Sequence, residues 1–91
     1  MTEDQQHALF IQAVAMLGGQ RATARALGIS ERNVRYLIAR TRTLHLGFIR
    51  DTANALDHHG RACRALAKAL DPMFTANRTP EQQAKWEKAH G

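Results

Sequence analysis

Hydrophobic residues recur every three or four positions along most of the chain, a spacing that places them on one face of an α-helix. The first such face is made by Leu9, Phe10, Ala13, Val14 and Leu17. Thr2 followed by Gln5 is a capping box, so we expect this helix to begin near Glu3. The pair Gly18-Gly19 ends it, because glycine adopts the left-handed conformation at no steric cost.

Two shorter helices are expected next. One covers residues 20–27 and stops at Gly28, and the other runs from Glu31 to about Arg40 with Ser30 as its N-cap. The inward positions of this pair are Ala24, Leu27, Val34, Leu37 and Ile38. Residues 41–43, which are polar or β-branched, then connect this pair to the next helix.

The longest pattern lies in the second half of the chain. Its apolar positions are Ile49, Ala53, Leu56, Gly60, Cys63, Ala67 and Leu70. This alternation of four and three residues is a heptad repeat, and we call these seven positions the seam. Every second seam position is small, which lets two helix backbones approach closely. Asp71-Pro72 ends the helix, since a residue before proline disfavours the α conformation.

A polar stretch over residues 75–78 leads to a last, short helix. Thr79 is its N-cap, Pro80 occupies its first position and Gln82 completes a capping box. Trp86 is the only large apolar residue in this helix, so the helix either docks through it or stays loose.

These elements predict an all-α fold, with a compact domain of about four helices, a long fourth helix and a short C-terminal helix. We expect residues 1–72 to form the functional domain, and residues 73–91 to form a polar linker and the last helix. With 91 residues and 5% aromatic side chains the core is small, so a buried enzyme active site is not expected. Met16, Met73 and Phe74 are most simply core residues.

Several features indicate a cytoplasmic protein without a membrane partner. A lone Cys63 rules out an intrachain disulfide and fits a reducing compartment. No apolar run reaches the roughly 18 residues that span a bilayer. The acidic and polar start, with Glu3 and Asp4, is unlike a signal peptide.

The positive charge is concentrated in one window. The chain carries a net charge of +5, and residues 20–50 hold seven arginines against the single acid Glu31. A guanidinium binds phosphate and guanine edges with two parallel hydrogen bonds, so such a patch on a small protein points to nucleic acid. A solvated basic face is the alternative.

The expected pair of helices over residues 20–39 has the stereochemistry of a helix-turn-helix. Ala24 stands where the two helices cross too closely for a larger side chain, and Gly28 stands where the turn needs a positive φ. Leu27, Ile29, Val34 and Leu37 occupy the positions that lock such a pair at a steep angle.

The segment GGQRATARALGISERNVRYLIA resembles the helix-turn-helix of the Cro/repressor (XRE-like) superfamily, in particular small phage and prophage regulators, including anti-CRISPR-associated regulators. The resemblance covers about residues 8–56 and is strongest over 20–39, whereas residues 71–91 match nothing in the family. It implies a dimeric transcriptional repressor that sits on a short palindromic operator in double-stranded DNA and acts at the nucleoid.

Because Val34 and Leu37 face inward, helical periodicity turns other residues of the third helix outward. The resemblance implies that the N-terminal part of this helix enters the DNA major groove. The expected DNA-binding residues are Gln20, Thr23, Glu31, Arg32, Asn33, Arg35, Tyr36, Arg40 and Arg42. Arg32 and Arg35 suit guanine O6 and N7, whereas Gln20, Thr23, Arg40 and Arg42 suit the phosphate backbone.

Some of these residues have simpler roles that remain open. Glu31 in a first helical turn is favourable to the helix dipole without any DNA. Tyr36 could pack against the end of the long helix. Arg32 and Arg35 could be ordinary surface charges.

For the dimer we expect the second half of the long helix to pair across a two-fold axis. The interface residues are Gly60, Cys63, Leu66, Ala67 and Leu70. Phe48, Ile49, Ala53 and Leu56 then close the core of each monomer; alternatively, the whole seam packs within one chain.

No cofactor or metal is expected. His59 and Cys63 are spaced for one helix face, but two ligands do not close a tetrahedral site. No nucleophile triad, paired carboxylates or phosphate-binding loop stands out. Rival functions remain open. One is an antitoxin-like module that binds a protein partner through the C-terminal segment or the seam, and another is a non-specific architectural DNA binder. An activator that contacts polymerase is also possible.

Overall fold

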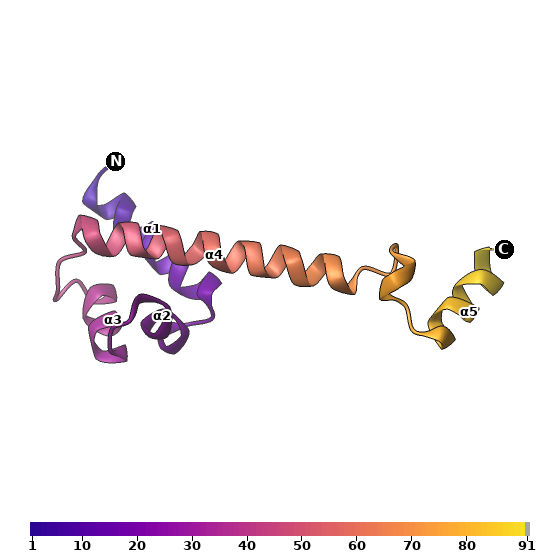
Figure 1. Cartoon of the computed structure of the whole chain (residues 1–91). Coiled ribbons are helices and arrows are strands. Elements are labelled where there is room, and N and C mark those ends of the chain that lie inside the picture. The colour runs from indigo at the N-terminus through magenta and orange to yellow at the C-terminus, as the bar shows by residue number, and fades with distance from the viewer. Residues whose placement is uncertain (91) are drawn as a thin grey trace. The chain divides into compact units, whose positions relative to one another are not determined.

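The computed structural model describes residues 1–90, and over this range the regular structure is entirely helical. The elements are α1 (Glu3–Leu17), α2 (Gln20–Leu27), α3 (Glu31–Ile38), α4 (Leu46–Leu70), the 3-10 helix η1 (Thr75–Asn77) and α5 (Pro80–His90) (Figure 1). The all-α class is therefore confirmed. None of the helices within residues 1–90 combines the length and the apolar character that crossing a membrane requires.

Contacts divide the chain into two compact units, Met1–Gly60 and a second unit that begins at Arg61. Helices α1, α2 and α3 lie in the first unit, α5 lies in the second, and the division falls inside α4. The boundary expected after residue 72 is a functional one, and it stays a prediction.

The helix ends follow the local signals in the sequence. The Thr2 hydroxyl accepts a hydrogen bond from the Gln5 backbone N–H at 3.1 Å, and the Gln5 side chain accepts one from the Thr2 N–H at 2.8 Å. Ser30 caps α3 by accepting from the Asn33 N–H at 3.1 Å. Gly28 ends α2 in the left-handed conformation, with φ at 69°. The predicted caps are confirmed, and α3 ends at Ile38, slightly before the expected Arg40.

The core of the first unit is formed by one face each of α1, α2 and α3. Its buried members are Phe10, Val14, Ala24, Val34 and Leu37, and Leu27, Ile29, Ile38, Leu44 and Phe48 pack around them. Val34 and Leu37 are wholly buried. Burial of each such side chain contributes about 1.5–3 kcal/mol, so α3 is held mainly by these two residues.

Several expected core positions are exposed instead. Met16 and Met73 are 71% and 70% exposed and Phe74 is about half exposed, so their assignment to the core is wrong. Leu9 is about half exposed because it flanks the buried face of α1. Apolar character alone does not decide burial, since a folded surface retains much apolar area.

The first half of α4 closes the core only in part. Phe48 packs against the core and Thr52 is buried, with its hydroxyl donating to the Phe48 carbonyl oxygen at 2.7 Å. Ile49 and Leu56 are half-buried and Ala53 is exposed. These three residues line an open apolar hollow of about 340 Å³ beside α1, together with Met1, Leu9, Phe10 and Ala13.

In the second unit, Asn77 caps the end of α4. Its amide donates to the Lys68 carbonyl oxygen at 2.8 Å and to the Asp71 carbonyl oxygen at 3.0 Å. The capping box of Thr79 and Gln82 that starts α5 is confirmed.

Trp86 is half-buried by its own unit. The Arg78 guanidinium lies 4.0 Å from the centre of the indole ring, and the His90 imidazole stacks on it at 3.8 Å. This sandwich anchors α5 to the segment that precedes it.

Replacing Gly28 with Ala tests the turn between α2 and α3. No atom would contact the added Cβ, so the cost is purely conformational. We expect Gly28→Ala to lower the free energy of unfolding by about 1–2 kcal/mol, because L-residues are strained at this φ. The decrease in the free energy of unfolding should be less than half as large for Gly28→Asn, since asparagine tolerates the left-handed conformation. Urea unfolding followed by circular dichroism measures both, and equal losses would contradict this explanation.

Candidate nucleic-acid interface

Helix α3 has one buried face and one exposed face. Val34 and Leu37 are buried in the core, whereas Glu31, Arg32 and Arg35 are exposed. Tyr36 is 41% exposed and follows Arg32 by one helical turn, so the two side chains share a side of the helix. The simpler possibility that Tyr36 is packed away therefore accounts for only part of its surface.

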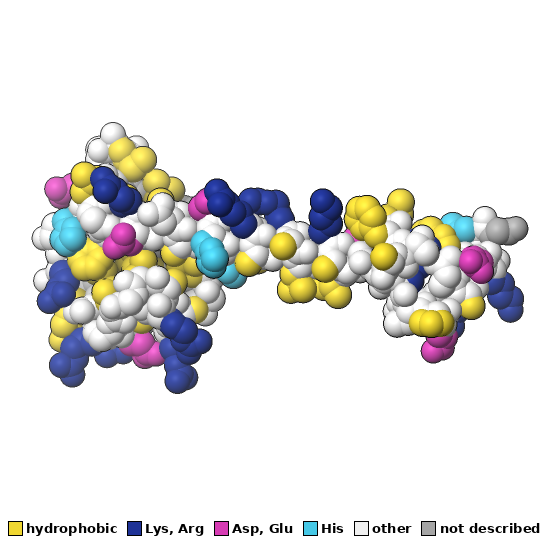
Figure 2. Space-filling model, in the orientation of Figure 1, with side chains coloured by type: hydrophobic (Ala, Val, Ile, Leu, Met, Phe, Trp, Pro, Cys, Tyr) yellow, Lys and Arg dark blue, Asp and Glu magenta, His cyan; other side chains and the backbone are white. Residues whose placement is uncertain are grey.

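Basic side chains gather over α2 and α3. Figure 2 shows Lys and Arg side chains (dark blue) along the lower edge of the part that holds these helices. The exposed arginines of the two helices are Arg21, Arg25, Arg32 and Arg35. Glu31 lies among them, with its Oε1 3.7 Å from Nε of Arg21. This exposed ion pair is weak, so it leaves Glu31 able to change partner.

The two expected contacts at the start of α2 have different environments. Gln20 is exposed at the first position of the helix. Thr23 is completely buried, and its hydroxyl donates to the Gly19 carbonyl oxygen at 2.8 Å. The prediction that the Thr23 side chain contacts phosphate is therefore wrong, because the hydroxyl already has its partner inside the protein.

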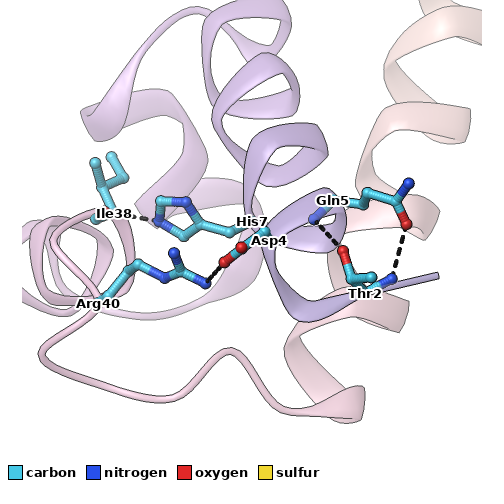
Figure 3. Close-up of polar contacts among 6 residues, drawn as sticks. All are labelled: Thr2, Asp4, Gln5, His7, Ile38 and Arg40. Carbon is cyan, nitrogen blue, oxygen red and sulfur yellow. Dashed lines mark hydrogen bonds and ion pairs between the residues drawn. The ribbon is translucent and has the colours of Figure 1, made fainter.

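The C-terminal end of α3 is tied to α1 (Figure 3). Nε2 of His7 lies 2.8 Å from the carbonyl oxygen of Ile38. A carbonyl oxygen only accepts, so this nitrogen carries the proton and donates it. The bond satisfies one of the carbonyl groups that a helix end leaves without a partner.

Arg40 makes a second link to α1. Its backbone is left-handed, with φ at 63°, and its Nη2 lies 2.6 Å from Oδ1 of Asp4. The guanidinium therefore has a role within the chain, and its remaining N–H groups stay available to other acceptors. Arg42, two residues further on, is exposed. Asn33 is half-buried, so only part of its side chain can reach a ligand.

His7 and Asp4 are absent from the residues that the sequence singles out. They meet their partners across 31 and 36 positions of the chain. No local pattern connects residues so far apart, and only the acidic character of the first turn of α1 hints at a basic neighbour.

The expected dimer residues all lie on α4. Cys63, Leu66, Ala67 and Leu70 are exposed, and Gly60 is half-buried. Leu66 and Leu70 are 62% and 70% exposed. Within residues 1–90, no three His, Cys, Asp or Glu side chains lie close enough together to hold a metal ion.

No protein-family model, curated protein or solved structure matches this chain. What the protein does is therefore inferred from its own side chains. Among them, the exposed arginines of α3 and the exposed outer seam residues Cys63, Ala67 and Leu70 are the features with the clearest chemistry.

His7→Ala tests whether the histidine supports α3. Loss of its bond leaves the Ile38 carbonyl group without this partner, so we expect the free energy of unfolding to fall by about 1 kcal/mol. His58 is exposed on α4, and His58→Ala should change the free energy of unfolding by less than about 0.5 kcal/mol. Denaturant unfolding compares the two variants. Equal effects would show that the His7 contact contributes nothing specific.

Proposed function

We propose that the protein is a sequence-specific transcriptional regulator that binds double-stranded DNA through α3. The observation that carries the proposal is the exposure of Arg32 and Arg35 on a helix whose other face is fixed by Val34 and Leu37. A short, rigidly seated helix with exposed arginines is suited to the major groove, which admits one α-helix.

In this proposal, the residues of α3 outside the core have chemical roles. Arg32 and Arg35 donate two parallel hydrogen bonds to O6 and N7 of guanine. Glu31 exchanges Arg21 for a cytosine amine, and Tyr36 contacts a phosphate or a thymine methyl group. Asn33 contacts an adenine edge or a phosphate with the exposed part of its amide.

Contacts to the DNA backbone come from both sides of α3. Gln20 begins α2, whose first turn has no side-chain cap, so backbone N–H groups there can also face a phosphate. Arg42 and the unused N–H groups of Arg40 supply positive charge after α3. Such contacts set the position of the protein on the duplex without reading sequence.

The regulator acts as a dimer. One copy of α3 reads only a few base pairs, whereas two copies related by a two-fold axis read a palindrome with half-sites about 34 Å apart. The exposed apolar residues of the second half of α4 support pairing there. Repression, rather than activation, and action on the nucleoid are implied only by the resemblance to Cro/repressor proteins, whereas the lone Cys63 fits a reducing compartment such as the cytoplasm.

A second candidate function is binding of a protein partner, as in an antitoxin. The exposed Met73 and Phe74 after α4 favour it, because apolar side chains together in solvent mark contact surfaces. A Met73→Ser/Phe74→Ser double variant that keeps full DNA binding and full repression would count against this function.

Selection of bound duplexes from a random pool, followed by sequencing, tests the proposal. We expect a palindromic consensus. Enrichment without any consensus would favour a non-specific architectural binder, and no retention of DNA at moderate salt would contradict DNA binding altogether.

Arg35→Ala should weaken binding to the selected operator by roughly 1–3 kcal/mol and relax the preference at one base pair, because the bidentate contact is lost. Lys88→Ala, which removes an exposed charge on α5, is the matched control and should leave the preference unchanged. Gel-shift titrations on the operator and on single-base variants measure both. Unchanged affinity and preference in Arg35→Ala would remove Arg35 from the reading surface.

A further inference from the structure

Much of the seam on α4 is not covered by the chain's own residues. Its inner half, at Ile49, Ala53 and Leu56, lines the hollow beside α1, and its outer residues Cys63, Ala67 and Leu70 are exposed. We propose that a second copy of the chain covers the seam from Ala53 to Leu70, with the two α4 helices antiparallel and Gly60 of each copy opposite Cys63 of the other. This inference rests on the dimer proposed above and specifies its geometry.

The side-chain sizes along the seam fit this antiparallel register. With Gly60 opposite Cys63, Ala53 faces Leu70 and Leu56 faces Ala67 of the second copy. Each layer then combines one small residue with one larger residue, and the two central Gly60–Cys63 layers are the narrowest, so the two helices approach each other most closely there. By two-fold symmetry every layer occurs twice, so each pair of residues contributes twice to the stability of the dimer.

The hollow beside α1 can bury the side chain of Leu70 from the second copy. Ala53 and Leu56 form part of its lining, and Ala53 is the layer partner of Leu70. Leu70 of the second copy, 70% exposed in the single chain, therefore enters the hollow. Its burial removes apolar surface from water on both sides of the contact, which is the main source of affinity at such interfaces.

Charges beside the seam select the register. Each residue that directly follows a larger seam position is charged, and the signs alternate as Arg50, Asp57, Arg64 and Asp71. In an antiparallel pair these flanking residues meet each other. The proposed register brings Arg50 near Asp71 and Asp57 near Arg64, offset by two residues or about 3 Å along the axis. A carboxylate has several acceptor sites, so these pairs do not require it to give up contacts within its own chain.

Other pairings lose this complementarity. Sliding the helices by seven residues in either direction puts like charges together, Asp57 on Asp57 in one case and Arg64 on Arg64 in the other. A parallel pair stacks Ala53, Gly60 and Ala67 each on itself, which leaves gaps between wider layers. A parallel pair also places no opposite charges across the seam. The charged residues that follow the larger seam positions would then face Thr52, His59 and Leu66 of the second copy. Repulsion in the wrong registers is how charged flanks give specificity.

Cross-linking of full-length chains tests the register. In a Cys63→Ala background, Ala53→Cys and Leu70→Cys are made as separate single-cysteine variants. We expect a short bis-maleimide reagent to link an equimolar mixture of the two but neither variant alone. In the proposed register residue 53 faces residue 70, whereas two copies of residue 53 lie about 26 Å apart along the axis. Non-reducing electrophoresis and mass spectrometry identify the linked cysteines.

Each other outcome overturns the proposal in a recognisable way. Cross-links within each single variant, but none between the two variants, indicate parallel pairing; the dimeric DNA-binding function would then survive. No cross-link together with a monomeric mass in sedimentation overturns the dimer itself. Operator binding by the same variants is measured separately, so failure of the register and failure of DNA binding are told apart.

A charge exchange gives an independent test. Asp57→Arg and Arg64→Asp each place like charges across the two-fold axis twice, and each should weaken dimerisation about 10-fold. The double variant restores opposite charges and should return to within about 3-fold of the original dissociation constant. Sedimentation equilibrium measures the constants, and circular dichroism checks that α4 stays helical. A double variant weaker than both single variants would overturn the register.

Discussion

The complete burial of Val34 and Leu37 is the constraint on which the rest of the first unit depends. These two side chains set the rotation of α3 about its own axis, because both must point into the small core shared with α1 and α2. Once they are fixed, Arg32 and Arg35 can only face outward. The chemistry of the surface is therefore a consequence of packing underneath it, and Gly28 matters because it lets the chain turn tightly enough to bring α3 onto that core.

The two ends of α3 are secured by different means. Ser30 caps its start with a local hydrogen bond, whereas its end is held by His7 and, just beyond it, by the Asp4–Arg40 pair. The same acidic first turn of α1 also suits the positive end of its own helix dipole. Holding a helix at both ends limits its motion, and an ordered helix loses less conformational entropy when it binds a groove.

The sequence was a good guide wherever the physics is local. The caps at Thr2, Ser30 and Thr79 depend on side chains three residues away, and these are confirmed. The phosphate contact predicted for Thr23 is wrong because its hydroxyl returns to the carbonyl group four residues earlier and is buried. Met16 differs in the opposite sense, since its apolar side chain lies outside the buried face of α1 and is exposed. The link from His7 to Ile38 depends on tertiary packing, which no spacing rule encodes. Operator recognition and dimerisation stay predictions.

The chain has one tyrosine and one tryptophan, and they belong to different parts of it. Tyr36 stands on the exposed face of α3, while Trp86 is held between Arg78 and His90 in the second unit. Two natural chromophores thus report on separate surfaces. Quenching of the phenol emission follows events at the arginine-rich helix, and the indole spectrum follows the surroundings of α5, with no label attached to either.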